Sequence, residues 1–346
     1  MKSCLLYSVL LLLTSWTYAQ GPGSIENIDV SQGTGEEERV VNIAFTLSGG
    51  DYYAIKLGIK FHEGDDFTPI QADEIMELDP DDIIDTHLNE TIKGAIVVET
   101  GHVELTWDGR ESFAEIDAAA ARLEITATRG LKDIDGNFYK TVLIGDQEWM
   151  AENLRVSRDA AGNNISRYCY DDDPDLCDLY GGLYTWHTVM NGQSSSSSSP
   201  SGVLGICPTG WHVPSDAEWT ELVNYVVSQG FPNSCVVNGA GNALKSCRQV
   251  SSPLGGDCDT SEHPRWNSDD TRHGFDEFGF SALPGGCREN DGSFYYLGTH
   301  GYWWSSTEGS SLDARAQYMR RSYGAVHRYF TNKTFGFSLR CIRVID

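Results

Sequence analysis

Tyrosine and arginine side chains gather near the end of the chain, where the local charge opposes that of the rest of the sequence. Between positions 286 and 345, eight Lys or Arg residues stand against four Asp or Glu residues, whereas the 346-residue chain has a net charge of −25. Six tyrosines share this stretch: Tyr295, Tyr296, Tyr302, Tyr318, Tyr323 and Tyr329. Tyr and Arg offer large contact areas at a small loss of side-chain entropy, so they are typical of binding surfaces. We therefore expect non-covalent recognition here.

The polar segment Glu308–Thr334 is the expected binding segment, because it follows WWSST (Trp303–Thr307), whose apolar residues indicate a buried strand. Tyr295, Tyr296 and His300 are expected to assist it. An anionic ligand would depend on arginines through charge-assisted hydrogen bonds, and these are Arg320, Arg321 and Arg328. A sugar would instead stack on tyrosines, namely Tyr318, Tyr323 and Tyr329.

Covalent chemistry finds no comparable support in the sequence. The chain contains no HExxH, GxSxG or Walker A motif. The glycine pattern GAGNAL (Gly239–Leu244) is incomplete and lacks a strand–helix–strand context, so it does not predict dinucleotide binding. The nine histidines are scattered and mark no general base. We expect a protein that is not an enzyme and requires no cofactor.

One acidic cluster suits a metal ion. Five aspartates stand close together, namely Asp171, Asp172, Asp173, Asp175 and Asp178. Hard carboxylate oxygens are the ligands that Ca²⁺ prefers, so a structural calcium on Asp171, Asp173 and Asp178 is one interpretation. A solvated acidic turn braced by a local pair of Cys169 and Cys177 explains the same residues. Removal of calcium by EDTA would separate the two, because only the first predicts a lower melting temperature.

The first residues and the cysteines predict export. Lys2 precedes the apolar run Leu5–Leu13, and small residues at Thr17 and Ala19 suit cleavage before Gln20. Residues 1–19 are thus an expected signal peptide, since the run is too short to span a membrane. The eight cysteines after Cys4 all lie between positions 169 and 341, which indicates disulfides in a secreted, periplasmic or cell-surface protein. We expect all eight to be oxidised.

Charge divides the mature sequence into two expected domains, 20–130 and 131–346. Residues 21–130 carry 24 acidic and 7 basic side chains and no cysteine, whereas residues 131–346 carry 26 acidic and 17 basic ones. This acidity argues against nucleic acid as a partner, because phosphate binding needs clustered positive charge. The first domain alternates apolar and polar residues, for example at Val41, Ile43, Phe45 and Leu47. Alternating short strands predict an all-β immunoglobulin- or fibronectin-III-like sandwich.

The second domain mixes helix and strand signals. Ser215 and Glu218 form a capping box ahead of apolar residues at helical spacing, which predicts a helix over Ser215–Gln229. The apolar stretch Leu179–Met190 predicts a second helix ending at Asn191-Gly192. The strand candidates are Phe278–Leu283, Phe294–Leu297, Tyr302–Ser306 and Phe337–Val344.

Six ordered motifs resemble a known family. They are DIDGNFYKTVLIGDQEWMAENLR (Asp133–Arg155), YGGLYTW (Tyr180–Trp186), GICPTGWHVPSDAEW (Gly205–Trp219), GFSALPGGCR (Gly279–Arg288), GYWWSST (Gly301–Thr307) and GFSLRCIRV (Gly336–Val344). Together they closely resemble the Fibrobacter succinogenes major paralogous domain over residues 131–346. Ser31–Leu47 resembles more loosely the sandwich that often precedes this domain in exported Bacteroidota proteins.

The resemblance carries expectations about fold and site. It implies an α+β C-type-lectin-like domain with two helices, a mixed sheet and long loops, and it suggests the disulfide Cys207–Cys341. Some proteins of this fold are binding proteins diversified by a retroelement between the WW strand and the last strand. The corresponding residues here are Tyr318, Arg320, Ser322, Tyr323, His327 and Tyr329.

Three functions follow in order of expectation. The first is an exported, non-enzymatic binding protein for an extracellular protein or glycan. The second is a structural surface or adhesin component without a dedicated ligand site. The third is an enzyme related to the formylglycine-generating enzymes, which share the fold, although their reactive cysteine pair and copper site have no counterpart that can be mapped onto this sequence.

Overall fold

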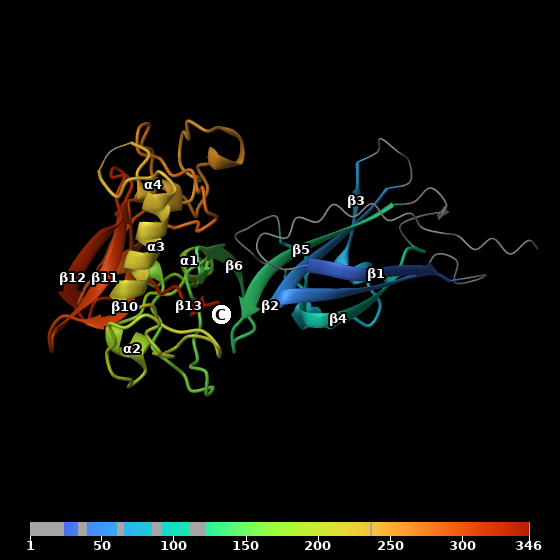
Figure 1. The fold of residues 1–346 in the computed structure, drawn as a ribbon, viewed down its shortest axis with the longest axis horizontal. Coiled ribbons are helices and arrows are strands. Elements are labelled where there is room, and N and C mark those ends of the chain that lie inside the picture. Colours follow the sequence, from blue (N-terminus) through green and yellow to red (C-terminus); the bar gives the residue numbers. More distant parts are fainter. Residues whose placement is uncertain are drawn as a thin grey trace, which may run out of the picture. The chain divides into compact units, whose positions relative to one another are not determined.

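The chain forms two compact units, residues 1–131 and 132–346 (Figure 1). The computed structural model describes residues 24–33, 40–60, 66–84, 92–110, 122–235 and 237–345. The expected signal peptide, residues 1–19, lies outside the described residues. Within the described ranges, no helix combines the length and apolarity needed to cross a lipid bilayer. The fold as a whole is mostly β-sheet with four α-helices among the described residues.

The first unit is built around one long strand. Its strands are β1 (Ser24–Gln32), β2 (Val40–Lys60), β3 (Thr68–Ile70), β4 (Ile96–Asp108) and β5 (Arg122–Lys132). The strand β2 pairs antiparallel with each of the other four. Its register with β4 shifts between Leu47 and Tyr52, beside Gly49, whose φ of 88° suits glycine. The first half of β2 also pairs with β1 and the second half with β3 and β5, while β4 pairs with both halves.

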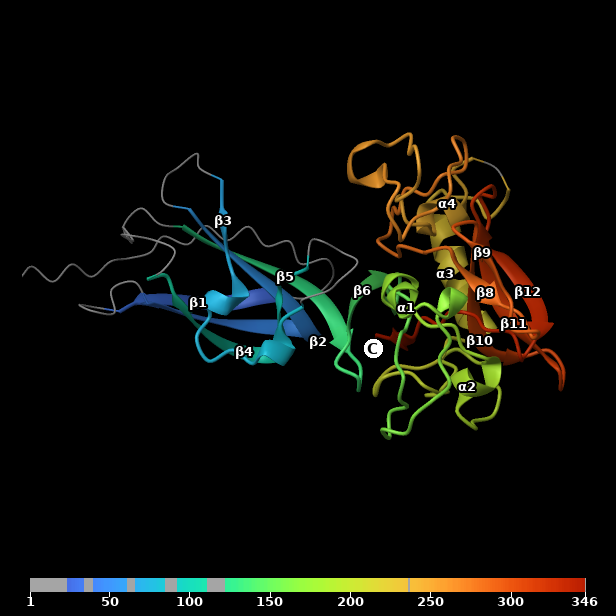
Figure 2. The ribbon, with the colours of Figure 1, turned by 180° about the vertical axis from the view of Figure 1, so that it is seen from behind.

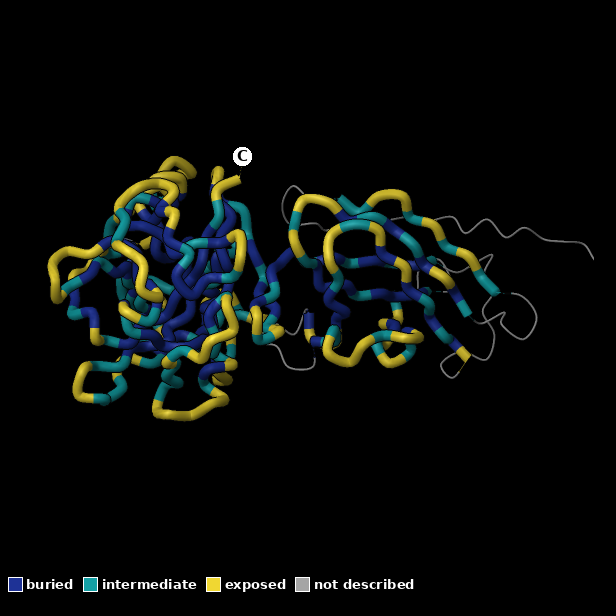
Figure 3. The backbone as a smooth tube through the Cα atoms, turned by 90° about the horizontal axis from the view of Figure 1, so that it is seen from below, coloured by how far each residue is buried: buried dark blue, intermediate teal, exposed yellow. Residues whose placement is uncertain are grey.

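The expected alternation of apolar, buried residues with polar, more exposed residues in this unit is confirmed. Val41, Ile43, Phe45 and Leu47 are all buried, while the residues between them are more exposed. They share one core with Trp107. Figure 3 shows the buried positions alternating with exposed ones along these strands. Burial of one face of each strand is what alternating sequences produce in a sheet.

The second unit contains two groups of strands. The larger sheet has the order β12-β11-β10-β8-β9, with β10 parallel to β8 and the other neighbours antiparallel. A smaller antiparallel group has the order β6-β7-β13. The bounds are β6 (Phe138–Ile144), β7 (Gln147–Met150), β8 (Gly285–Arg288), β9 (Phe294–Leu297), β10 (His300–Glu308), β11 (Asp313–Arg320), β12 (His327–Asn332) and β13 (Ile342–Val344). Figure 2 shows the larger sheet from behind.

The helix α3 (Asp216–Ser228) confirms the expected helix over Ser215–Gln229. The Ser215 hydroxyl accepts from the Glu218 amide at 3.1 Å, and the Glu218 carboxylate accepts from the Ser215 amide at 2.8 Å. These bonds satisfy two amide groups that a helix start otherwise leaves unpaired. The apolar side of α3 joins a core that includes Trp149, Trp219 and Trp303. That core lies against β10 and β11, so α3 covers one face of the larger sheet (Figure 1).

The expected single helix over Leu179–Met190 is wrong. The structure has α1 (Pro174–Tyr180) and α2 (Trp186–Met190), separated by a turn at Gly181. The φ of Gly181 is 83°, and a Cβ there would lie 2.4 Å from the Asn153 Cβ. Close approach of another segment therefore ends the first helix. A fourth short helix is α4 (Ala240–Leu244).

The strand expectations hold in part. Phe294–Leu297 is β9, and Tyr302–Ser306 lies inside β10. Only the last three residues of the expected strand Phe337–Val344 form β13. Phe278–Leu283 is not a strand, although Ala282 makes an isolated bridge with Lys245. Single bridges replace continuous ladders in this loop-rich part of the chain.

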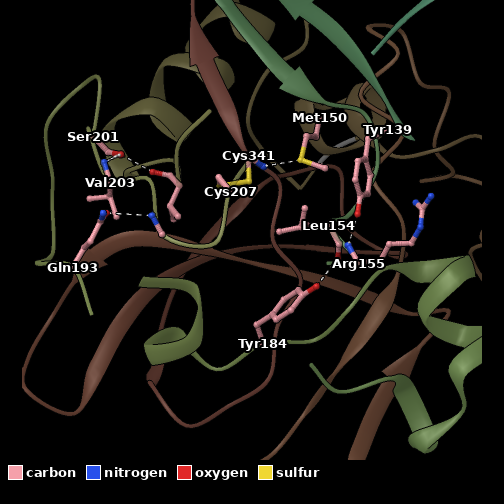
Figure 4. Close-up of a disulfide and its surroundings, with 12 residues drawn as sticks. Tyr139, Met150, Leu154, Arg155, Tyr184, Gln193, Ser201, Val203, Cys207 and Cys341 are labelled. Carbon is pink, nitrogen blue, oxygen red and sulfur yellow. Dashed lines mark hydrogen bonds between the residues drawn. A yellow bond between two sulfur atoms is a disulfide. The ribbon is translucent and has the colours of Figure 1, made fainter. Parts of the chain in front are cut away.

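Three disulfides cross-link the second unit. Cys169–Cys177 and Cys207–Cys341 match the two expected pairs, and Cys247–Cys258 is a third. Figure 4 shows Cys207–Cys341, where the Cys341 amide donates to the Met150 sulfur at 3.2 Å. This bridge ties the loop before α3 to the segment that leads into β13.

The expectation that all eight cysteines are oxidised is wrong, because Cys235 and Cys287 are free. The Cys235 sulfur lies 3.9 Å from His327 Nε2 on β12, whereas Cys287 belongs to β8. The strands β11 and β10 separate β12 from β8. Neighbouring strands are about 4.8 Å apart, so the two cysteines lie beyond the roughly 7 Å between Cα atoms that a disulfide spans.

Candidate functional site

The face of the larger sheet opposite α3 carries a continuous set of rings. Tyr302 on β10 pairs directly with Tyr318 on β11, and Tyr318 pairs directly with His327 on β12. Directly opposite residues project to the same side of a sheet, so these three rings form a row across three strands. We call the whole set the aromatic face, and its members are Tyr295, Tyr296, His300, Tyr302, Tyr318, Tyr323, His327, Tyr329 and Phe337.

Each ring of the aromatic face contacts at least one neighbouring ring. His300 stacks on Tyr302 with 5.7 Å between ring centroids, and Tyr318 stacks on His327 at 4.9 Å. Tyr302 is also 5.7 Å from Tyr318 and 4.8 Å from Phe337. Offset and tilted ring pairs at these distances are favourable beyond the area they bury. Mutual packing on a sheet therefore restricts the rings of the face to one arrangement.

Parts of this face are open to solvent. Tyr295, Tyr296 and Tyr329 are 40%, 47% and 40% exposed. Tyr302, Tyr318 and His327 are half-buried. Exposed large aromatic side chains gathered on one surface are a feature that marks interaction sites in soluble proteins.

Tyr296 has an unusual backbone conformation. Its φ is 72°, in the left-handed region that residues with a bulky side chain seldom occupy. The amide and hydroxyl of Thr299 both donate to the Tyr296 carbonyl, at 3.0 and 2.9 Å. The turn places the Tyr296 ring 4.6 Å from His300. Backbone strain of this kind is found where a side chain must be held in a set position.

The two histidines of the face are neutral at physiological pH. Burial lowers the pKa of His300 to about 4, and the positive charges of Arg320 and Arg321 act in the same direction. Burial together with Arg320 also lowers the pKa of His327. Burial raises the pKa of Tyr302 and of Tyr318, so both keep their hydroxyl protons. The face therefore presents neutral rings with hydrogen-bonding edges.

Two arginines border the face. The Arg320 guanidinium lies over the Tyr323 ring, 4.4 Å from its centroid. Arg321 donates to the Ser268 carbonyl at 3.1 Å. Among the described residues, neither arginine has a carboxylate within ion-pair distance. Ser322 lies between them and Tyr323 in the turn after β11.

Arg328, an expected contact residue, belongs to the other side of the sheet. Its Nε donates to Asp216 Oδ1 at 3.0 Å, and a second nitrogen also bonds the same carboxylate. Gln317 donates to Asp216 Oδ1 at 3.0 Å as well. Asp216 begins α3, so this interaction joins the sheet to the helix. Arg328 is one position before Tyr329, and consecutive strand residues project to opposite faces.

A buried lysine fixes the turn that carries the arginines. The Lys245 ammonium donates to the carbonyls of Arg320, Arg321 and Tyr323 at 3.2, 3.1 and 3.2 Å, and to that of Arg272 at 2.6 Å. Burial lowers the pKa of Lys245 to about 7. Nothing in the sequence around α4 marked this lysine, because its partners are backbone atoms of distant segments.

The sequence indicates only indirectly that Tyr302 and Phe337 belong to the aromatic face. Trp303 is buried in the α3-side core, so alternation places Tyr302 on the opposite face. Phe337 reaches Tyr302 from the segment before β13. Trp303 and Trp304 are both fully buried, as expected for this strand.

The acidic cluster gains no support as a calcium site. Asp173 caps α1 by accepting from the Asp175 amide at 3.0 Å, and Asp171 and Asp178 belong to separate turns of the same segment. Across the described part of the chain, no three His, Cys, Asp or Glu side chains are grouped so that they could hold a metal ion.

The free thiols differ in environment. Burial raises the pKa of Cys287 to about 12, and the negative charge of Glu289 adds to this effect. A thiol with such a pKa stays protonated at neutral pH, and the thiolate is the reactive form. Cys235 is exposed.

Comparison with known proteins gives one result. No curated protein matches the chain, and no solved structure does. The model of the Fibrobacter succinogenes major domain matches residues 142–343, which is more than half of the chain and includes every member of the aromatic face. The chain therefore belongs to the Fibrobacter succinogenes major domain family.

Proposed function

We propose that this chain is an exported, non-enzymatic binding protein whose second unit recognises an extracellular protein or glycan through the aromatic face. The observation that carries the proposal is the ring array itself. Nine aromatic or imidazole side chains from β9, β10, β11, β12 and adjoining segments contact one another, and three tyrosines among them are at least 40% exposed.

The strained tyrosine supports the same function. A left-handed φ at a bulky residue costs about 1–2 kcal/mol, and glycine would avoid that cost. Tyr296 nevertheless occupies such a position with its ring 47% exposed. Its ring contributes little to the core, so we attribute its presence to contact with a ligand.

The rest of the chain fits a recognition role. We propose that the second unit has the C-type-lectin-like fold and that the first unit is an immunoglobulin- or fibronectin-III-like spacer. Three disulfides suit an oxidising compartment. A rigid sheet that carries exposed side chains is a usual arrangement for binding, because the scaffold holds the contact residues in place.

The test is a search of glycan and protein arrays with the full chain, followed by affinity measurements with two face variants. Tyr296→Gly and Tyr329→Ser each remove an exposed ring. Phe330→Ser is the matched control, because Phe330 is 51% exposed on the same strand but contacts Arg315 on the α3 side. We expect each face variant to weaken binding at least tenfold and the control to leave it unchanged.

Two results would overturn the proposal. One is a ligand whose affinity is the same for the wild type and both face variants. The other is the absence of any ligand on either array, which would favour a structural surface component.

A further inference from the structure

Arg320 and Arg321 have no carboxylate within ion-pair distance among the residues that the structure describes. Arg158, Arg328 and Arg343 each lie within ion-pair distance of a carboxylate. The Arg320 side chain makes no hydrogen bond to a described residue, and its Nε is buried without a partner. In a chain with 50 acidic and 25 basic residues, two adjacent arginines without carboxylates leave a local excess of positive charge.

That charge acts directly on the aromatic face. Arg320 and Arg321 are the charged groups that lower the pKa of His300, and Arg320 does the same for His327. No carboxylate is among the groups that perturb either histidine. A ligand on these rings therefore meets positive charge at the Arg320 end of the face.

The area that a ligand would contact favours an acidic sugar over an acidic protein as the ligand of the face. A stable protein interface covers about 800 Å² on each partner, which would extend beyond the ring array onto the surrounding surface. Residues 131–285 of the second unit carry 21 acidic and 9 basic side chains, so an acidic protein that extended from the face onto that part of the unit would be repelled. A sugar chain contacts the rings and the two arginines alone.

We infer that the ligand of the aromatic face is an oligosaccharide that carries a carboxylate group. The inference rests on the proposed function and adds the chemical class of the ligand. The sugar rings lie on the tyrosine rings, and the carboxylate accepts hydrogen bonds from Arg320 and Arg321. Arginine suits this task, because its planar guanidinium matches a carboxylate in a two-point hydrogen bond.

The test uses pairs of probes that differ only in charge. Oligomers of galacturonate, hyaluronan and alginate, together with sialyllactose, are each compared with the methyl ester of the same molecule by titration calorimetry on the full chain. The ester keeps the sugar rings and removes the negative charge. The variant is Arg320→Gln with Arg321→Gln, and the charge-matched control is Lys93→Gln with Arg110→Gln in the first unit.

We expect at least one acid to bind tenfold or more tightly than its ester, and the double arginine variant to reduce its affinity to that of the ester. The control should bind as the wild type does. Added salt should weaken binding of the acid and leave the ester unaffected, because screening acts on the charge contribution alone.

Three results would overturn the inference. They are equal affinity for acids and esters, no effect of the double arginine variant, and no binding by any of the four acids. Esters that bind as tightly as the acids and lose affinity in Tyr296→Gly would refute the acidic sugar while the proposed function stands. An acidic protein as the only ligand found on the arrays would likewise refute the sugar and keep the face as the site.

Discussion

Tyr296 offers a direct test of the site at the scale of one residue, because its backbone and its ring can be separated. Both Tyr296→Gly and Tyr296→Ala remove the ring contact with His300, which has a centroid distance of 4.6 Å. Only glycine accepts a φ of 72° without strain. We expect the glycine variant to be more stable than the alanine variant by about 1 kcal/mol in denaturant unfolding. An alanine variant of equal or greater stability would contradict the strained conformation.

The low pKa of His300 predicts a response to acid. The folded-state pKa is about 4, below the roughly 6.5 of an unfolded chain, so the unfolded state binds more protons between these values. The free energy of unfolding should therefore fall as the pH drops from 6.5 to 4. His300 is only half-buried, so solvent screening reduces its share to about 1–2 kcal/mol.

His300→Gln is the variant that isolates this contribution. Chemical unfolding at pH 7 and at pH 4.5 should show a smaller loss of stability on acidification for the variant than for the wild type. The lowered pKa of His327 acts in the same direction and remains in both proteins. An identical loss in the two proteins would show that His300 is not held neutral by its surroundings.

At this scale, residue types in the sequence predicted most of the rings that the structure brings together. Tyrosines and arginines in an acidic chain pointed to this region, and seven of the eleven expected contact residues are rings of the aromatic face. Arg328 instead lies on the α3 side of the sheet, and residue composition carries no information about which face of a strand a side chain takes. That choice depends on the register of β12 with β11, which pairs Arg328 with Gln317 on the α3 side.

Lys245 connects the site to its supporting elements. Its ammonium holds the Arg320–Tyr323 turn through three carbonyls and joins it to Arg272. Lys245→Met keeps the length of the side chain but leaves these carbonyls without their donor. Each buried group that loses its partner costs about 1–3 kcal/mol, although the turn relaxes in part. We expect a stability loss of about 2–4 kcal/mol and faster amide exchange around Tyr323.

Lys333→Met is the matched control for this prediction. Lys333 is also buried, but its ammonium bonds Glu308 at 2.6 Å, at the other end of the strands. Both variants should lose stability, whereas only Lys245→Met should change exchange in the turn and weaken ligand binding. Equal effects of the two variants on binding would mean that Lys245 has no particular part in placing the turn.

The helices show why some secondary-structure elements could be predicted from the sequence and others could not. Local signals determine α3, where the capping box and the apolar spacing lie within one stretch of sequence. The stretch Leu179–Met190 carries similar apolar spacing, but contact between Gly181 and Asn153 divides it. That contact joins residues 28 positions apart in sequence, so no local pattern reports it.

For the whole molecule, charge and cysteine content indicated a boundary between residues 130 and 131, and the compact units meet between 131 and 132.

The disulfides could be predicted only in part. The pair Cys207–Cys341 joins residues 134 positions apart and was predicted from the family resemblance, whereas Cys169–Cys177 was predicted from proximity in sequence. Cys247–Cys258 could not be assigned, because four cysteines remained and an even count gives no connectivity. An even count also suggested complete pairing, which the sheet order rules out for Cys235 and Cys287.

Free thiols can be counted in a chain that begins at Gln20 and so lacks Cys4. Six cysteines form three disulfides, which leaves Cys235 and Cys287. Cys235 is exposed and should react with a thiol reagent in the native protein. Cys287 is buried on β8 with a pKa raised to about 12, so it should react only after denaturation. We expect one thiol per chain before denaturation and two after it, without a reductant.

Two variants assign those thiols. Cys235→Ser should abolish the native reaction and leave one thiol in the denatured chain, while Cys287→Ala should leave the native reaction unchanged. No reactive thiols under denaturing conditions would mean that the two cysteines pair with each other. Such a bond would need β8 and the loop beside β12 to come together across β10 and β11, and the order of strands that presents the aromatic face would then be wrong. The thiol count therefore tests the sheet on which the proposed site depends.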